Sequence, residues 1–277
     1  MKNNGIIPPH FLYFLENEEI EVTNFKSGDF NNPLKYDRAV VKFPFINTTF
    51  DIQVIFDNLD YSLPPDFVPL VNCDQLVISY STLVKNWNFR ESSSLYYAIK
   101  TIKDEYCNIM TKKVYNFLAN QNASNYNDNQ NEPPSIYMYL YDWLNYFMNK
   151  TKSLEVLMNL DKKNDFIFSY CIDIEIRSRI IDRKPILIIA IDSKNMCYTI
   201  NLKVPKYISI ENLGLKFNEV FKDIVNFKNI ISKYELNILE YFQKMSFREN
   251  LSQRILNMSN LNFSYKLKNR YWFSIRN

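Results

Sequence analysis

The strongest constraint on the fold of this chain is a pair of alternating apolar runs that lead into a double proline. The runs are Arg38–Phe45 and Thr49–Phe56, and their alternation predicts two paired β-strands. The chain then continues from Tyr61 to Phe67 as YSLPPDF. Consecutive prolines restrict the backbone, remove two N–H donors and favour an extended conformation for the residue before them. The pattern predicts a sheet that runs into a rigid extended segment, which cannot continue the hydrogen-bonded ladder.

The surrounding residues predict a first domain over residues 1–118. A helix is expected where Pro8 and Pro9 precede an apolar segment, because proline is favourable in the first helical turn. A long helix is expected after the double proline, with one apolar face packed on the sheet. The expected elements are a helix at Ile6–Glu16, a strand at Glu19–Asn24 and a helix at Leu95–Phe117 with the apolar stripe Tyr96, Ile99, Ile102 and Tyr106.

Residues 119–134 are rich in Asn and Gln and end in Pro133-Pro134. Such a composition cannot bury enough apolar surface to order itself, so we expect a disordered linker. A second domain is expected over residues 135–277, with the same order of helix, strands, proline and helix. Its predicted elements are a helix at Ser135–Lys150, strands at Leu154–Asn159, Asp165–Ile176, Pro185–Asp192 and Met196–Val204, and a helix at Val225–Phe247. The continuous apolar run Ile186–Ile191 predicts a strand buried on both faces.

The residue inventory excludes several catalytic chemistries. The chain has one histidine, His10, and three glycines, so a two-histidine metal site and a glycine-rich phosphate loop are excluded. His10 lies at a predicted helix start, and we expect a surface residue rather than a catalytic base. The four cysteines, at positions 73, 107, 171 and 197, have no CxxC spacing. We therefore expect free thiols in a reducing compartment, and no metal or other cofactor.

Two carboxylate pairs remain as candidates for acid–base chemistry, Asp173 with Glu175 and Asp51 with Asp57. Asp173 and Glu175 are two residues apart in an alternating stretch, which places both on one face of a strand. A solvated sheet face accounts for this pattern without chemistry, and it is the interpretation we adopt.

Charge and hydropathy favour neither nucleic acid nor a membrane as a partner. The formal net charge is only +3, and no stretch reaches the ~20 apolar residues of a membrane helix. The last segment, Leu261–Asn277, interleaves aromatic residues with Lys and Arg. This pattern occurs in single-stranded nucleic-acid binding, in partner-binding tails, and in terminal elements that pack their aromatics on a preceding domain. We adopt the packing interpretation.

The segment from Tyr61 to Phe67, followed by Trp87-Asn88 and a long helical pattern, resembles the BRE family (brain and reproductive organ-expressed protein). Lys26-Ser27-Gly28 and Asp37-Arg38 precede the strands as they do in that family. The likeness covers roughly residues 6–117, and in the second half it is limited to Asn201–Pro205 and Leu213–Phe221. The residues that carry the family motif are Tyr61, Pro64, Pro65, Asp66, Phe67 and Trp87.

The resemblance implies an α+β fold of tandem ubiquitin-conjugating-enzyme variant (UEV) domains, each an antiparallel meander with flanking helices. It implies a non-catalytic scaffold or adaptor subunit of a BRISC-like complex that cleaves lysine-sixty-three-linked ubiquitin chains, or of the related BRCA-type A complex. The implied partners are JAMM/MPN deubiquitinase subunits, a von Willebrand-like MERIT-type subunit and ubiquitin. The implied setting is the cytoplasm and the nucleus, with DNA-damage signalling and DNA repair as the process.

Two other functions remain open. A stand-alone ubiquitin-binding or ubiquitin-ligase-associated UEV module would use the same fold with other partners. An active conjugating enzyme would need a thioester at Cys73, but the chain has no His-Pro-Asn tripeptide to stabilise the oxyanion. We therefore predict no enzyme activity. The chain is shorter than animal members of the family, so partner-binding residues cannot be carried over.

Overall fold

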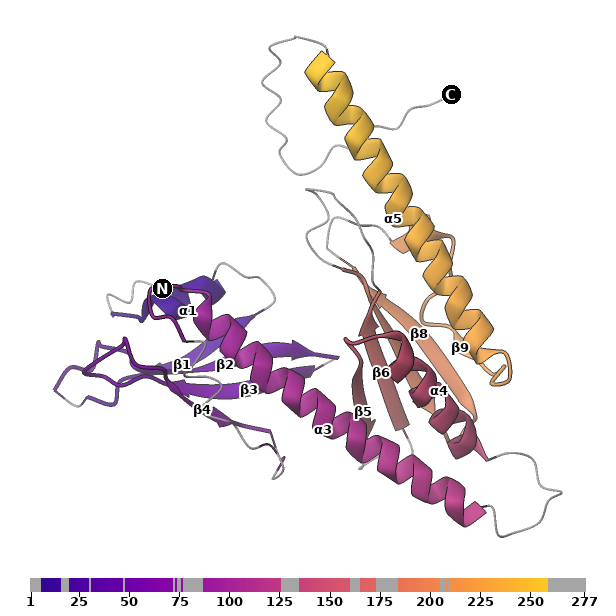
Figure 1. Ribbon diagram of the computed structural model, residues 1–277, viewed down its shortest axis with the longest axis horizontal. Helices are drawn as coiled ribbons and strands as arrows, with labels where there is room; N and C mark the ends of the chain where they lie inside the picture. Colours follow the sequence, from indigo (N-terminus) through magenta and orange to yellow (C-terminus); the bar gives the residue numbers. More distant parts are fainter. Residues whose placement is uncertain are drawn as a thin grey trace. The chain divides into compact units, whose positions relative to one another are not determined.

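The computed structural model describes residues 6–15, 20–29, 31–46, 48–71, 73, 76, 87–125, 135–159, 165–172, 184–204, 208 and 210–258. These residues form an α+β structure with two antiparallel sheets and four α-helices (Figure 1). The α+β class predicted from the sequence is confirmed. The chain divides into two compact units, one of Met1–Ser124 with Glu155–Leu157 and one of Asn125–Leu154 with Met158–Asn277.

The first unit contains a four-stranded antiparallel meander in the order β1-β2-β3-β4. Its central hairpin pairs Val41 with Ile52 and Phe43 with Phe50, so alternate apolar residues of both strands share one buried face. The second strand has the predicted bounds, and the first and third are shifted by one or two residues. The strands are β1 (Glu21–Lys26), β2 (Arg38–Phe45), β3 (Thr48–Ile55) and β4 (Asp66–Pro69).

The fourth strand corrects the prediction that the ladder ends at the double proline. β4 begins directly after Pro65 and pairs with β3, from Asp66 opposite Ile55 to Pro69 opposite Ile52. The prolines interrupt the ladder only where they stand, because the residues after them again carry N–H donors. The double proline therefore shapes the turn between two paired strands.

The first helix, α1 (Pro9–Leu15), is shorter than predicted at its start. Ile6 instead forms a parallel bridge with Lys35, because its N–H donates to the carbonyl of Leu34 and its carbonyl accepts from Tyr36. The residue before a proline disfavours the helical conformation, so the helix begins at the second proline of the pair.

The second helix of this unit, α3 (Ser94–Asn125), packs its apolar stripe on the sheet as predicted. Ile99, Ile102 and Tyr106 are buried, and Tyr96, the first residue of the predicted stripe, is half-buried. The rings of Tyr106 and Phe50 on β3 are 5.2 Å apart. The helix also corrects the predicted linker, because residues 119–125 are helical rather than disordered. Each added helical residue gains one backbone hydrogen bond, which carries α3 past its last buried residue, Leu118. Residues 126–134 lie outside the described residues.

The second unit contains most of a five-stranded antiparallel sheet in the order β5-β6-β7-β8-β9; the first three residues of β5, Glu155–Leu157, are grouped with the first unit. Its elements are α4 (Ile136–Lys150), β5 (Glu155–Asn159), β6 (Asp165–Cys171), β7 (Ile186–Asp192), β8 (Cys197–Lys203), a 3-10 helix (Ile210–Leu213), β9 (Val220–Phe221) and α5 (Phe227–Met258). The sequence did not predict the 3-10 helix or β9. The last predicted helix ends at residue 247, whereas α5 continues to Met258.

Both helices of this unit pack on the same face of the sheet. Trp143 of α4 stacks on Phe227 of α5 with ring centroids 3.6 Å apart, and Phe227 also meets Tyr198 of β8 edge-on. The opposite face of β7 carries Ile188, which is buried, between two half-buried residues. The prediction of burial on both faces therefore holds in full for Ile188 and in part for its neighbours.

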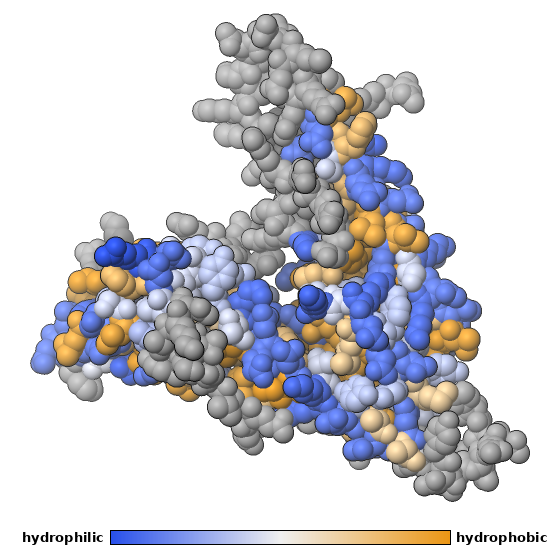
Figure 2. Space-filling model, in the orientation of Figure 1, coloured by the Kyte–Doolittle hydropathy of each residue, from blue (hydrophilic) through white to orange (hydrophobic). Residues whose placement is uncertain are grey.

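Two sequence predictions fall outside the described residues. They are the carboxylate pair Asp173 and Glu175, and the terminal segment Leu261–Asn277. On the face of the molecule shown in Figure 2, hydrophilic residues are interspersed with hydrophobic ones. No described helix is long and apolar enough to cross a membrane.

Candidate functional site

The candidate site is the turn between β3 and β4, which contains the motif residues Tyr61, Pro64 and Pro65 and leads into Asp66 and Phe67 at the start of β4. Two aspartates organise its start: Asp57 Oδ1 accepts the N–H of Leu59 at 2.8 Å, and Asp60 Oδ1 accepts the N–H of Ser62 at 2.9 Å. Such side-chain caps replace backbone hydrogen bonds in turns. Pro64 and Pro65 follow without N–H donors, and Pro65 is buried. The backbone of this turn is thus specified by short-range contacts.

Tyr61 ties the turn to the rest of the first unit. Its hydroxyl donates to the carbonyl of Tyr36 at 3.2 Å, and its ring meets Phe56 edge-on at 5.9 Å. The Lys35 ammonium lies 5.0 Å from the ring centroid and also donates to the carbonyl of Asn58. Burial raises the pKa of Tyr61, with a smaller contribution from the charge of Asp37. Tyr61 therefore remains a neutral hydrogen-bond donor at physiological pH.

Trp87 holds the other side of the turn. Its Nε1 donates to the carbonyl of Ser62 at 3.0 Å, and its ring lies 4.7 Å from His10 and 6.1 Å from Phe56. The side chain is half-buried, so it covers the end of the core while keeping one part in solvent. Trp87 therefore acts first as a structural clamp on the turn.

His10 corrects the sequence prediction, because it is buried rather than on the surface. Only 2% of the residue is exposed, and neither ring nitrogen has a hydrogen-bond partner of regular geometry among the described residues. Burial lowers the pKa of His10, and nearby backbone groups of Asn88 and Phe89 offset part of that effect. The residue follows two prolines at a helix start, which suggested exposure. The contact with Trp87 brings together residues far apart in the sequence, which a local pattern cannot show.

Asp37 explains why a glycine stands at position 28. Its buried carboxylate accepts the N–H of Gly28 at 2.9 Å and pairs with Arg38 Nε at 3.0 Å. A Cβ atom on Gly28 would lie 2.0 Å from Arg38 Nη2 and 2.7 Å from Asp37 Oδ2. The segments Lys26-Ser27-Gly28 and Asp37-Arg38 thus contact each other, and this contact joins the β1–β2 connection to the start of β2.

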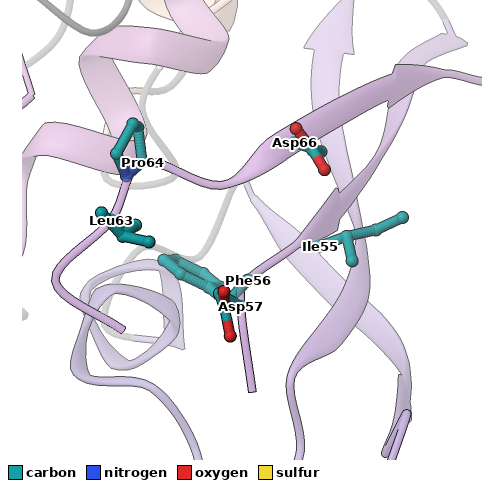
Figure 3. A pocket seen from close by; sticks show the side chains of 6 residues that line it. All are labelled: Ile55, Phe56, Asp57, Leu63, Pro64 and Asp66. Atoms are coloured by element: carbon teal, nitrogen blue, oxygen red, sulfur yellow. The ribbon is translucent and has the colours of Figure 1, made fainter. Parts of the chain in front are cut away.

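A small hollow lies beside the turn (Figure 3). Its volume is about 270 Å³, and it is open to solvent. Leu63 and Pro64 border one side of it and Ile55 and Asp66 the other, with the ring of Phe56 extending towards Leu63. Asp57, two residues after the end of β3, completes the lining. The two motif residues Pro64 and Asp66 thus lie at the hollow, while Tyr61 and Trp87 act on the turn that shapes it.

The remaining candidate groups are not assembled into a catalytic centre within the described part of the chain. Cys73 is half-buried, with Lys113 Nζ 4.0 Å from its sulfur. Burial raises the pKa of Cys107 to about 12, which keeps that thiol protonated and unreactive. Asp51 and Asp57 are six positions apart along β3 and its extension, a separation of about 20 Å in a strand, so they do not form a pair. Among the described residues, no group of three or more potential metal ligands comes together.

Comparison of the sequence with models of known protein families gives no match, and comparison with curated proteins gives none either.

Proposed function

We propose that the chain consists of two UEV-like domains of the BRE family and serves as a non-catalytic scaffold or adaptor subunit. The observation that carries the proposal is the shared order of both units: a helix, an antiparallel meander and a long second helix. In the first unit, the meander includes the YSLPPDF turn, and Trp87 bonds to that turn before α3 begins. The resemblance implies this order of elements.

A scaffold role is supported by the surroundings of the histidine and of the cysteine that a transferase would use. The single histidine of the chain is covered by Trp87, and its nitrogens face no described carboxylate or thiol. Cys73 lies in a segment without the His-Pro-Asn tripeptide. The best-defined side chains of the site, Tyr61, Trp87 and Asp37, hold the structure together.

The proposed assembly is a BRISC-like complex of JAMM/MPN subunits and a von Willebrand-like MERIT-type subunit. Its reaction is cleavage of lysine-sixty-three-linked ubiquitin chains, and its setting is the cytoplasm and nucleus. This part of the proposal rests on the resemblance of residues 6–117 and on the motif residues described above.

The test is affinity purification of the tagged chain from its own cells, with mass spectrometry and a cleavage assay on the eluate. We expect a JAMM/MPN pair, a von Willebrand-like subunit, and chelator-sensitive cleavage of lysine-sixty-three-linked chains. An untagged culture supplies the background. Recovery of ubiquitin or a ligase without any JAMM protein would overturn the scaffold proposal in favour of a stand-alone ubiquitin-binding module.

A further inference from the structure

The charge of this chain is unevenly distributed around the β3–β4 turn. Residues 43–84 contain five aspartates and no Glu, Lys or Arg, which gives the segment a formal charge of −5. Because the whole chain is +3, the remaining residues carry +8. The hollow described above is therefore lined mainly by residues of an acidic stretch in a chain that is weakly basic overall.

Within that region, the hollow combines two carboxylates with an apolar base. Asp57 and Asp66 are both exposed, whereas Phe56 beneath them is 2% exposed. Phe56 contacts several rings of the core, so the base is rigid. Leu63, 48% exposed, adds apolar surface at the rim. A hollow of this kind matches a side chain with an apolar stem and a charged head.

The charges at the hollow are not neutralised by described cations. The Asp66 carboxylate makes no hydrogen bond or ion pair with any described residue, and Asp57 uses one oxygen to cap Leu59. The described cations on β2 and directly before it are engaged elsewhere; Lys42, for example, pairs with Glu21. Arg38 pairs with Asp37, and Lys35 donates to a turn carbonyl. As far as the described residues go, the two aspartates therefore remain available to a cation of a partner.

The neighbouring sheet edge excludes another mode of recognition. β4 is the last strand of the four-stranded sheet in the described structure, and Leu70 N donates inward to Asp51 O. Backbone groups alternate along a strand, so the N–H of Val68 also points towards β3, whereas the backbone groups of Phe67 and Pro69 point away from the sheet. Proline has no N–H, so half of the outward donors of this short strand are missing. A partner strand would find few N–H donors at the outer edge of β4, so recognition of a partner through side chains is favoured.

We propose that the hollow between Asp57 and Asp66 binds a Lys or Arg side chain of a partner protein. The stem lies on Phe56 and Pro64, the charged head lies between the two carboxylates, and Leu63 contacts an apolar neighbour in the partner sequence. Two carboxylates that flank one cation attract it more strongly than a single carboxylate does. The inference goes beyond the scaffold role and stands without it.

The test uses the full chain, ¹⁵N-labelled, titrated with the peptide acetyl-Ala-Leu-Lys-Leu-Ala-amide and followed by NMR. The comparison peptide replaces Lys by norleucine, which keeps the stem and removes the charge. The variants are Asp57→Asn and Asp66→Asn, since Asn keeps the side-chain shape and, at position 57, the turn cap. The matched control is Asp60→Asn, which lies in the same turn, keeps its own cap and does not line the hollow.

We expect saturable shifts at Phe56, Leu63 and their neighbours, and a Kd at least about tenfold weaker for the norleucine peptide, a difference of about 1.4 kcal/mol. Each hollow variant is expected to weaken binding several-fold and Asp60→Asn to leave it unchanged, with the amide spectra reporting that all variants remain folded. Raising the salt concentration to about 0.5 M also weakens binding, because the attraction is screened. The proposal is overturned by absent shifts at the hollow, by equal binding of the two peptides, or by an equal loss in Asp60→Asn.

Discussion

Glu235 of α5 joins three elements of the second unit through a buried polar network. Its Oε1 accepts the hydroxyl of Tyr170 on β6 at 2.6 Å, and its Oε2 accepts the ammonium of Lys150 at the end of α4. Lys150 also donates to the hydroxyl of Tyr146 at 2.8 Å, which lies 3.4 Å from Ser232 Oγ. Burial, followed by the charge of Glu235, raises the pKa of Tyr170, so its hydroxyl stays protonated and donates throughout the accessible pH range.

Truncation of this residue, Glu235→Ala, should be among the most destabilising single changes in the second unit. Breaking a buried ion pair costs about 3–5 kcal/mol, because the partner left behind is uncompensated. The Lys150 side chain is 34% exposed and can regain water, so its share is reduced. Only 3% of Tyr170 is exposed, so in this variant its hydroxyl stays without a hydrogen-bond partner, which costs about 1–3 kcal/mol. We expect a loss of about 3 kcal/mol of unfolding free energy, the lower end of the range for buried pairs.

The assay is thermal and urea unfolding with hydrogen exchange at the amides of β6 and β7, which reports on the second unit alone. The expected fall in Tm is about 6–12 °C, from about 2–4 °C per kcal/mol for a domain of this size. Glu235→Gln keeps an acceptor for Tyr170 and should lose about 1–2 kcal/mol. The double variant Glu235→Leu/Tyr170→Phe removes both ends of the bond, so it should be more stable than Glu235→Ala. The reasoning would be refuted if the double variant lost as much as the sum of its two single changes.

Three further predictions concern the first unit. Gly28→Ala should lower the unfolding free energy by about 1–3 kcal/mol in urea melts, because its Cβ would crowd the buried carboxylate of Asp37; an unchanged midpoint would mean that the loop moves away freely. Trp87→Phe should lower the unfolding free energy by about 1 kcal/mol, because it removes the hydrogen bond to Ser62. Trp87→Ala should lower it further, because the ring contact with His10 is lost as well. Equal losses in the two variants would contradict this structural role of the ring. Burial lowers the pKa of His10, so the unfolded chain binds the proton more readily than the folded one. The contribution of His10 to the unfolding free energy is therefore fully present above pH 6.5 and is lost as the pH falls through the pKa of the folded state. A His10→Phe variant with the same dependence of stability on pH would show that His10 is not its cause.

The elements that sequence predicted best are those whose signal is local. The alternation of Arg38–Phe45 gave the bounds of β2, and the spacing of Ile99, Ile102 and Tyr106 gave the buried face of α3. Element ends were less predictable. α3 passes into the Asn-rich segment because helix extension is cooperative, and composition alone indicated a linker there. β4 resumes after the double proline because β3 offers a free edge, which no pattern within YSLPPDF shows.

The candidate site divides in the same way. The motif residues Tyr61, Pro64, Pro65 and Trp87 were chosen from the sequence, but their roles follow from contacts with Tyr36 and Ser62. The hollow between Asp57 and Asp66 was missed. Its one sequence signal is the absence of Lys and Arg from residues 43–84, which suggests an acidic region but not a site.

By itself, the sequence determined the α+β class, the central strands, the apolar faces of the helices and the inventory of available chemistry. The tertiary structure decided that His10 lies buried beneath Trp87, that Asp37 fills the space beside Gly28, and that Glu235 pairs with groups on α4 and β6. Strand and helix periodicity is a property of neighbouring residues, so a linear pattern records it. Burial and charge pairing depend on which distant segments pack together, and that is settled only when the whole core forms.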